Sequence, residues 1–415
     1  MSRLDLEAQP SLTAALEQIF HYQAAQHTHI TCPILQSFDL LKQLSSIRKQ
    51  SLVYWSSRDG KDEIAAWGLA EVIQGSFVLS RAQGFAAEKK VRLFGCLSFD
   101  KSQTEDHLFW LPEWSLIQKN QYSVLHWHRP NPDIASFHPQ WHSAQLHPRP
   151  SKQHWISRIS ALKEAFSSGM LSKVVFAQQN IVQRPSTLGP IQSLEKLTQT
   201  EDKTFDFCFA PHPDYAFIGR SPERLIELKS DQIRTEALAG TRPRGRSIEE
   251  DQQLENDLFQ STKERMEHQI VVEAICQSLL PYVSSIDKRS EPTILKLSQV
   301  QHLHTPIQAK LKPNIPLSEV IDALHPTPAV CGTPRAKAMD IIRQTEDFKR
   351  GWYAGLVGWV EGEAAEFAVG IRSALYTKNQ IYFWAGAGIV AQSDPIAEWD
   401  EIEAKGKQFL DLVSQ

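Results

Sequence analysis

Residues 353–389, YAGLVGWVEGEAAEFAVGIRSALYTKNQIYFWAGAGI, consist of short apolar runs separated by glycine, lysine and asparagine. Runs of this length, rich in β-branched and aromatic residues and bounded by turn formers, are typical of β-strands. The stretch therefore predicts three consecutive strands, Tyr353–Glu361, Glu366–Thr377 and Gln380–Ile389. A β-rich core with helices packed outside it is the architecture that this pattern favours.

Short apolar runs of the same character lie upstream of this stretch. Before residue 126 they are SLVYWSS at 51–57, AWGLAEVI at 66–73, SFVLSR at 76–81 and VRLFGCLSFD at 91–100. After residue 154 they are Lys173–Gln178, Phe205–Ala210, Tyr215–Gly219 and Arg224–Leu228. Each of these runs is predicted to be a strand.

Capping residues and apolar periodicity predict helices in three places. One helix runs from His154 to about Gly169. Another runs from about Ile248 to Leu280, with Ser247 as its N-cap and three acidic residues in the first turn, where they favour the helix dipole. The carboxy-terminal helix begins with Asp394 and Pro395 in the N-cap and first-turn positions that such residues prefer.

Length and charge limit the class of protein. A chain of 415 residues is long enough for one large domain or two of ordinary size. Its 44 basic and 48 acidic residues leave a slight negative excess, which gives no reason to expect nucleic acid or an anionic membrane as a partner. The amino terminus carries charges instead of the uninterrupted apolar stretch of a signal peptide, and no segment has the roughly 20 apolar residues of a membrane span, so we expect a soluble, unprocessed chain. We therefore expect a protein that acts on a small substrate.

The cysteines indicate the cellular compartment. Their number is odd and none is in C-x-x-C spacing, which argues against a disulfide framework and against a thiolate zinc site. The five residues are Cys32, Cys96, Cys208, Cys276 and Cys331. We expect the protein to reside in the reducing cytoplasm.

The strongest break in sequence character lies between about residues 126 and 154. Proline, serine and six histidines are mixed there without helical or strand periodicity, so the segment is interpreted as a surface connection. It separates residues 1–150, a variable N-terminal part of the same fold, from residues 151–415, which carry the motifs described below. The spacing of the histidines matches no compact ligand pattern, which favours a solvated linker over a metal site. They are His126, His128, His138, His142, His147 and His154.

Two pairs of acidic residues have helical spacing. Glu264 and Glu267 lie three residues apart in KERMEH, and Glu398 and Glu401 lie three apart in AEWDEIEAK, so the members of each pair share a helix face. Four carboxylates from two helices would form a hard-oxygen site for a magnesium ion that bridges to a substrate carboxylate. Taken alone, each pair is more often a solvated helix face.

Basic and small residues near the carboxy terminus are candidates for binding a carboxylate. Lys405 lies one turn after the second acidic pair and could hold a substrate carboxylate or form a surface ion pair. Arg372 would share a strand face with Ala368 and Gly370, leaving space for a bidentate clamp, although a strand-end arginine can also face solvent. The glycines of AGAGIV at 385–390 are consistent with close approach of a ligand or with a β-bulge.

Taken together and in order, these motifs resemble those of the chorismate-binding enzymes, which make isochorismate, salicylate, anthranilate and aminodeoxychorismate. The resemblance covers nearly all of residues 154–415. The matching segments are KVVFA at 173–177, GRSPERL at 219–225, ALAGTRPRG at 237–245, KERMEH at 263–268, LHPTPAVCGTP at 324–334, RGWYAGLVGW at 350–359, the strand around Arg372, AGAGIV at 385–390 and SDPIAEWDEIEAK at 393–405.

The resemblance implies a fold and a set of functional residues. The family fold is a large α+β sandwich in which two stacked antiparallel sheets are flanked by helices. The residues implied to surround a magnesium ion are Glu264, Glu267, Glu398 and Glu401, with Glu267 and Glu401 as its direct or water-mediated ligands. Those implied to bind the substrate are Gly240 and Thr241 near the ring, Tyr353, Arg372, Gly388 and Lys405 at its carboxylates, and His325, which matches the active-site histidine of the family.

Within the family the chain resembles the isochorismate synthases. Their reaction adds water at C2 of chorismate and releases hydroxide from C4, which requires a base and an acid on opposite sides of the ring. Lys173, at the head of KVVFA, matches the base, and Glu223, in the S-P-E segment, matches the acid. Ammonia-using relatives carry glutamine at the position of Lys173, and aminodeoxychorismate synthases carry lysine at the position of Ala239.

The resemblance further implies Mg²⁺ as the cofactor, chorismate as the substrate, no glutaminase subunit and a monomeric chain. Salicylate synthase, which also eliminates pyruvate from isochorismate, is the alternative activity. A binding protein that keeps the fold without the chemistry is the alternative class. Isochorismate feeds menaquinone, siderophore and salicylate pathways alike. Gln178 stands where many isochorismate synthases have arginine, which leaves the local hydrogen bonding open.

Overall fold

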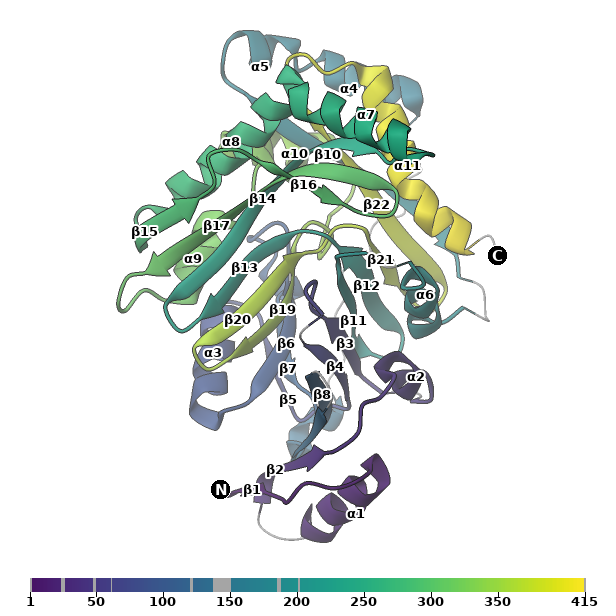
Figure 1. The fold of residues 1–415 in the computed structure, drawn as a ribbon, viewed down its shortest axis with the longest axis vertical. Coiled ribbons are helices and arrows are strands. Elements are labelled where there is room, and N and C mark those ends of the chain that lie inside the picture. The colour runs from purple at the N-terminus through teal and green to yellow at the C-terminus, as the bar shows by residue number, and fades with distance from the viewer. Residues whose placement is uncertain are drawn as a thin grey trace.

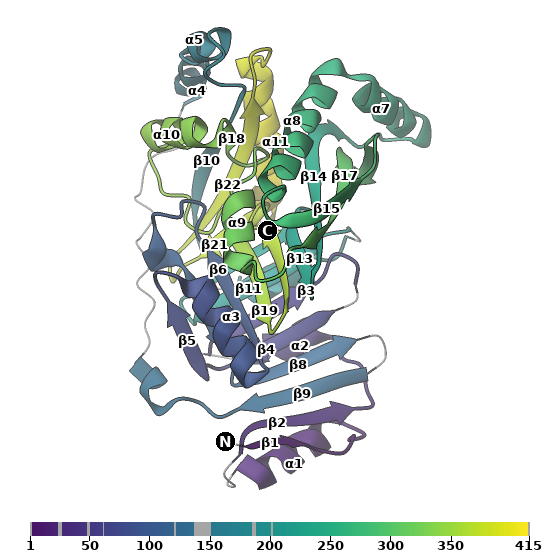
Figure 2. The same ribbon diagram turned by 90° about the vertical axis from the view of Figure 1, so that its left-hand side faces the viewer.

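The structure is a computed structural model that describes residues 2–23, 27–47, 50–60, 62–119, 122–136, 151–184, 188–200 and 202–413. Two large β-sheets share a core in it, and helices lie around them (Figures 1 and 2). This arrangement confirms the α+β fold of two sheets flanked by helices.

Sheet A has 12 strands and joins the two ends of the sequence. All neighbours are antiparallel except the first two, which are parallel. In spatial order the strands are β1 (Ser2–Asp5), β2 (His27–Ile34), β9 (Tyr122–His128), β8 (Trp114–Lys119), β4 (Glu63–Trp67), β3 (Leu52–Ser56), β11 (Phe205–His212), β12 (Tyr215–Ser221), β21 (Ser373–Tyr376), β22 (Gln380–Ile389), β10 (Lys173–Gln183) and β18 (Gly332–Thr333).

Sheet B has 10 strands, all paired antiparallel. Their order is β15 (Val283–Lys288), β17 (Val300–Leu311), β14 (Gln232–Pro243), β13 (Arg224–Lys229), β20 (Ala364–Val369), β19 (Leu356–Glu361), β6 (Arg92–Leu97), β7 (Leu108–Leu111) and β5 (Glu71–Gln74), with β16 (Thr293–Lys296) paired to β17.

Aromatic side chains of the two sheets meet in the core. Phe209 of sheet A lies edge to face against two rings of sheet B, Phe94 at 6.3 Å and Trp110 at 5.6 Å between ring centroids. Such pairs contribute about 0.5–1.5 kcal/mol each beyond the burial of their area. The opposite face of sheet A has its own apolar cluster, in which Phe383 stacks on Phe409 of the last helix.

Eleven α-helices in the described residues pack against the sheets or against one another. They are α1 (Leu12–Gln23), α2 (Leu40–Ser45), α3 (Val78–Lys89), α4 (Lys152–Ser160), α5 (Lys163–Ser167), α6 (Pro190–Leu197), α7 (Ile248–Gln260), α8 (Thr262–Leu279), α9 (Leu317–Leu324), α10 (Arg335–Thr345) and α11 (Pro395–Val413). Two short 3₁₀ turns, Thr104–Asp106 and Pro132–Ser136, complete the elements. None of the helices in the described part of the chain is both long and apolar enough to cross a bilayer.

The predicted helix from about Ile248 to Leu280 is two helices in the structure. Ser247 caps α7 as predicted, because its hydroxyl accepts from the amide of Glu250. At Ser261 the backbone is extended (φ −66°, ψ 113°) and the hydroxyl accepts from the amide of Glu264, so Ser261 ends α7 and caps α8. The sequence carried this signal, since Ser261 and Glu264 have the spacing of a capping box. The helix predicted from His154 is likewise divided, into α4 and α5.

Three strand predictions are wrong. The segment AWGLAEVI at 66–73 spans the end of β4 in sheet A and the start of β5 in sheet B. The segment SFVLSR forms the start of helix α3, where Val78, Leu79, Ala82 and Ala86 are buried at helical spacing. The stretch Glu366–Thr377 is two strands in different sheets, β20 and β21.

The chain changes sheets at Gly370 and Arg372, so the predicted strand face shared by Ala368, Gly370 and Arg372 does not exist. Gly370 lies so close to Trp352 that a Cβ atom would be 2.5 Å from the carbonyl oxygen of Trp352. Arg372 has a left-handed backbone (φ 49°). The strand ends because the backbone has to turn between the two sheets at this point.

The interpretation of residues 126–154 as a solvated linker is wrong at its start. His126 and His128 belong to β9, and the ring of His128 packs against His29 of β2 with centroids 4.3 Å apart. His154 is exposed at the start of α4. The three histidines between them, His138, His142 and His147, lie outside the described residues.

Candidate active site

The predicted site residues come from both sheets and from helices α8 and α11. Lys173 begins β10, and Gly388 lies near the end of the neighbouring strand β22. Lys263 of α8 contacts Glu398 of α11 at 3.3 Å, which joins the two acidic helices beside these strand ends (Figure 2). Segments more than 200 residues apart in the chain are thus assembled at one end of the sheets.

Lys173 is almost completely buried, with 1% of its surface exposed. Its ammonium group contacts the Glu267 carboxylate of α8, with Nζ and Oε1 2.8 Å apart. Gly388 leaves room for this pair: a Cβ atom at Gly388 would lie 2.8 Å from Glu267 Oε1 and 2.9 Å from Lys173 Cε. The glycine of AGAGIV is therefore needed for close approach by side chains of the site.

Glu223 is buried between β12 and β13 with 4% of its surface exposed. Burial, together with the nearby charge of Glu236, raises the pKa of its carboxyl to about 8, and Lys173, Thr327 and Arg58 only partly oppose this rise. Glu223 is therefore largely protonated at neutral pH.

Thr241, His302 and Arg372 form a continuous hydrogen-bonded chain. Arg372 Nη2 lies 2.9 Å from His302 Nε2, and His302 Nδ1 lies 3.0 Å from Thr241 Oγ1. Arginine can only donate, so Nε2 accepts and the proton of the neutral ring is on Nδ1. Burial and the charge of Arg372 lower the pKa of His302 well below its usual value. Burial lowers the pKa of Arg372 to about 10, so the guanidinium stays charged at neutral pH.

Lys405 and Tyr353 lie beside Gly386 of β22. Lys405 Nζ donates to the Gly386 carbonyl at 3.0 Å and pairs with Glu401 at 2.6 Å. The Tyr353 hydroxyl lies 3.0 Å from the position of a Cβ atom at Gly386. The Tyr353 ring is stacked on Trp384, with centroids 5.3 Å apart.

Each of the four acidic residues predicted to hold a metal has a cationic partner. The pairs are Glu264 with Arg242 (2.9 Å), Glu267 with Lys173 (2.8 Å), Glu398 with Lys263 (3.3 Å) and Glu401 with Lys405 (2.6 Å). Lys263 interacts electrostatically with Glu264 and Glu267 as well as with Glu398, so acidic residues of both helices share one neighbourhood.

This carboxylate set fits magnesium in donor type. Glu264, Glu267, Glu398 and Glu401 would offer the hard oxygen ligands that the ion prefers. Among the described residues, however, no three potential ligand side chains lie close enough together to hold an ion as they stand. The carboxylates would have to turn from their lysine and arginine partners to bind it.

His325 contacts the backbone next to Tyr353. It follows α9, is buried, and lies with Nε2 2.9 Å from the carbonyl oxygen of Ala354, next to Tyr353. Burial lowers the pKa of His325 to about 3, so the ring is neutral and donates to this carbonyl. The described contacts of His325 support the backbone beside Tyr353.

Several residues of the site were not predicted from the sequence. His302 was missed although His302 and His304 alternate on one strand and can share its face. Glu236 and Arg58, which surround Glu223, were also missed, because Arg58 lies far away in the N-terminal part. Gln178 is fully buried in β10, and its amide makes no hydrogen bond with the described residues.

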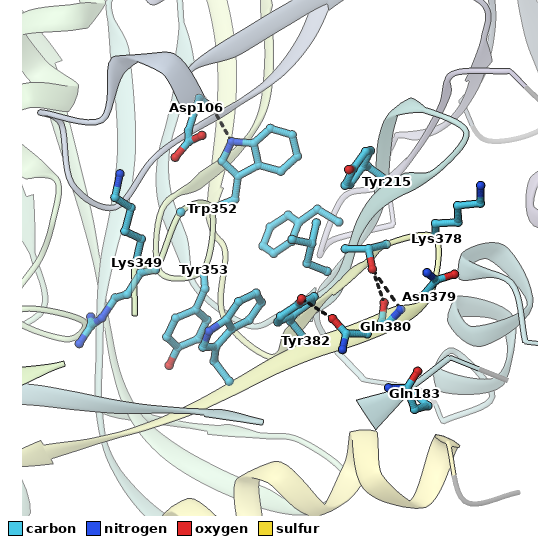
Figure 3. Close-up of a pocket in the computed structure, with 16 residues that line it drawn as sticks. Asp106, Gln183, Tyr215, Lys349, Trp352, Tyr353, Lys378, Asn379, Gln380 and Tyr382 are labelled. Carbon is cyan, nitrogen blue, oxygen red and sulfur yellow. Dashed lines mark hydrogen bonds between the residues drawn. The ribbon is translucent and has the colours of Figure 1, made fainter. Parts of the chain in front are cut away.

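Tyr353 also lines a cavity of about 490 Å³ (Figure 3). Aromatic residues line it, among them Tyr353, Trp384, Tyr382 and Trp352, whose indole donates to the Asp106 carbonyl at 2.6 Å. Lys173 and Glu223 are not among its lining residues. The cavity therefore adjoins the candidate site through Tyr353 without containing the proposed acid and base.

Comparison with known proteins identifies the relatives of the chain. A sequence profile of the family described as chorismate binding enzyme matches residues 127–414. The salicylate biosynthesis isochorismate synthase of Pseudomonas aeruginosa is 39% identical over 266 residues, 63% of this chain and 55% of that protein. This chain thus spans about half the length of that relative.

Other relatives match from end to end. The isochorismate synthase MenF of Escherichia coli is 31% identical over 441 residues, covering 97% of this chain and 99% of that protein. The solved structure of MenF, the menaquinone-specific isochorismate synthase from Escherichia coli, superimposes on 97% of this chain and 99% of that chain with a TM-score of 0.86 and 29% identity. The chain therefore belongs to the chorismate-binding enzyme family.

Proposed function

We propose that this protein is an isochorismate synthase, an isomerase that converts chorismate into isochorismate. The observation that carries the proposal is a buried lysine, Lys173, within electrostatic range of a buried and protonated glutamic acid, Glu223. Water would add at C2 of the ring while the double bond shifts and the C4 hydroxyl leaves. This displacement requires one base and one acid at the same site.

Glu223 would be the acid. A carboxyl with a pKa of about 8 is mostly protonated at neutral pH and can transfer its proton to the departing C4 hydroxyl, which then leaves as water. An ordinary glutamic acid, with a pKa near 4.3, would be ionised and could not do so. The burial of Glu223 thus supports this role.

Lys173 would be the base. In its neutral form it would take a proton from the attacking water as the new C–O bond forms at C2. The proton taken by Lys173 balances the proton given by Glu223, so the reaction is a net isomerisation. The reverse reaction would use the same two groups with their roles exchanged.

The remaining residues would hold the substrate. Arg372, kept in place by His302, would bind one substrate carboxylate through two N–H groups of its guanidinium. The Tyr353 hydroxyl and the Lys405 ammonium would donate further hydrogen bonds. Gly240, which is left-handed (φ 79°), and Thr241 would border the ring beside Glu264. A magnesium ion, held by Glu264, Glu267, Glu398 and Glu401, would neutralise a substrate carboxylate.

The proposal extends to partners and pathway. Because lysine occupies the position at which ammonia-using relatives carry glutamine, we propose that the protein works without a glutaminase subunit. We further propose that it is a monomer. The end-to-end match to MenF supports a role in menaquinone formation rather than siderophore or salicylate formation. The five free cysteines, four of them buried, fit the cytoplasm.

The experiment is product analysis of the purified protein with chorismate and magnesium. We expect isochorismate by chromatography, and loss of turnover when a chelator removes the ion. Formation of salicylate and pyruvate would instead show that the protein is a salicylate synthase. Unchanged chorismate would leave only a binding protein with this fold.

A further inference from the structure

The peptide groups on both sides of Glu223 are held by the partly buried side chain of Arg58 and the buried side chain of Glu236. Arg58 Nη1 donates to the carbonyl of Pro222 at 2.7 Å, and the amide of Arg224 donates to Glu236 Oε1 at 2.9 Å. Arg58 and Glu236 are themselves joined by a two-pronged ion pair, at 2.5 and 2.6 Å. One ion pair thus fixes the turn that carries Glu223.

Glu236 has no hydrogen-bonding capacity left over. Its Oε1 accepts from Arg58 and from the Arg224 amide, and its Oε2 accepts from Arg58 and from His304 Nε2 at 3.0 Å. Four donors fill the roughly four lone-pair sites of a carboxylate. A side chain bound in this way cannot change its rotamer without losing several charge-assisted bonds.

The charge of Glu236 is also fixed. Burial alone would raise the pKa of Glu236, but His304 and Arg58 hold it down to about 2. Glu236 is therefore a permanent negative charge, and this charge is the largest influence on Glu223 after burial. The charged groups around Glu223 are Glu236, Lys173 and Arg58.

We propose that the cluster of Arg58, Glu236 and His304 is a positioning device for the catalytic acid, which holds the turn that carries Glu223 and places the negative charge of Glu236 near its carboxyl. The inference rests on the proposed role of Glu223. It assigns a task to the N-terminal part of the chain, since Arg58 follows β3 whereas Glu236 and His304 lie in β14 and β17. A purely structural ion pair would fix the turn without setting the protonation state of Glu223.

The test compares the pH dependence of kcat/KM for isochorismate formation in wild type and in Glu236→Gln. The amide keeps the shape of the side chain but removes the negative charge and leaves Arg58 beside Glu223. Both changes favour the ionised acid, which cannot protonate the leaving group. The alkaline limb of the profile should therefore move to lower pH by about one unit. Activity at pH 8 would then fall about fivefold relative to wild type, with a much smaller loss at pH 6.

A matched control is Glu227→Gln, which removes a buried carboxylate from the same β13–β14 hairpin. Glu227 pairs with Lys229 and Arg234 and is not among the groups named as shifting the pKa of Glu223. The alkaline limb of the pH profile of Glu227→Gln should coincide with that of wild type.

Two further variants separate geometry from charge and guard against misfolding. Arg58→Lys keeps the charge but cannot hold Pro222 and both oxygens of Glu236, so kcat should fall at all pH values with the limb unmoved. The double variant Arg58→Gln with Glu236→Gln leaves no unpaired buried charge. Its limb should lie between those of Glu236→Gln and wild type.

The inference is overturned if folded Glu236→Gln, or the double variant, has the alkaline limb of wild type. This result is distinct from failure of the proposed function, because in that case the wild-type protein itself would form no isochorismate. Circular dichroism and thermal unfolding establish that each variant is folded before its profile is compared.

Discussion

Two carboxyl groups that interact electrostatically, Glu223 and Glu236, are equally buried but hold opposite protonation states at neutral pH. Burial and a neighbouring negative charge keep the proton on Glu223, whereas an arginine and a histidine keep Glu236 ionised. Groups whose environments separate their pKa values in this way often mark acid–base chemistry. The structure thus adds a physical argument for the proposed role of Glu223, which at the level of the sequence rested on the family resemblance alone.

Replacing either proposed catalytic residue should stop the reaction in both directions. Glu223→Gln cannot protonate the leaving hydroxyl, so kcat should fall by a factor of roughly 10² to 10⁴. Lys173→Gln should lose water activation to a similar degree, but it could keep some amination with ammonium at high pH, because ammonia needs less help as a nucleophile. Chromatography of the products from chorismate, with and without ammonium, measures both. Normal isochorismate formation by Lys173→Gln would show that another group is the base.

Arg372 should tolerate lysine poorly. The ammonium of Arg372→Lys keeps the charge but cannot donate to His302 and clamp a carboxylate at the same time. We expect kcat/KM for chorismate to fall about tenfold or more, with an unchanged melting temperature. Unaltered kcat and KM would mean that the guanidinium does not touch the substrate.

At the scale of elements, the metal hypothesis depends on the anchoring of helix α11. Asp394 Oδ1 accepts from the amides of Ile396 and Ala397 at 2.9 and 2.8 Å, which caps the helix that carries Glu398 and Glu401. Asp394→Ala should cost about 1 kcal/mol of stability and raise the magnesium concentration needed for half-maximal turnover. A variant with lower stability but an unchanged magnesium requirement would show that the cap does not act on the metal site.

A histidine cluster on β2 and β9 should make the fold sensitive to acid. Burial lowers the pKa of His29 to about 4 and that of His126 to about 3, while Arg3, Asp5 and Arg92 are the charged groups nearby. Below about pH 6.5 these histidines are protonated in the unfolded chain but stay neutral in the folded protein. The free energy of unfolding therefore decreases as the pH falls from 7. Urea unfolding of wild type and His29→Gln at pH 7 and pH 5 tests this. The variant should lose about 2 kcal/mol less than wild type over this interval, and equal losses would exclude His29 as a cause.

Local patterns predicted elements well where one segment decides its own structure. The strand Gln380–Ile389, the caps at Ser247 and Asp394 and the helical pairing of the acidic residues needed only neighbouring residues. The crossing at Arg372 and the burial of His126 could not be predicted in this way. Both depend on which strand lies alongside, and a pairing partner far away in the sequence, such as Thr31 for His126, leaves no local signal.

The same limit applies to the site. Glu264, Glu267, Glu398 and Glu401 could be found because their spacing is helical, and Lys173 because it heads a recognisable motif. Arg58 and His302 could not, because their function arises only when β3 and β17 are brought to the turn at Glu223 and to Arg372.

At the scale of the whole molecule, the sheets run through the boundary near residue 150. β3 pairs with β11 in sheet A, and β6 pairs with β19 in sheet B. Residues 151–415 expressed alone would expose both strand edges and lose Arg58, so we expect an unfolded product without activity. Far-ultraviolet circular dichroism and activity measure this. A folded, active fragment would show that the N-terminal part is dispensable.

The most direct test of the proposed chemistry is isotopic. Wild-type protein is incubated with chorismate and magnesium in water enriched in ¹⁸O, and the product is analysed by mass spectrometry and NMR. The account predicts isochorismate that carries ¹⁸O at the C2 hydroxyl, because Lys173 activates a solvent water and Glu223 releases the original C4 hydroxyl. Unlabelled isochorismate, or chorismate recovered unchanged, would contradict it.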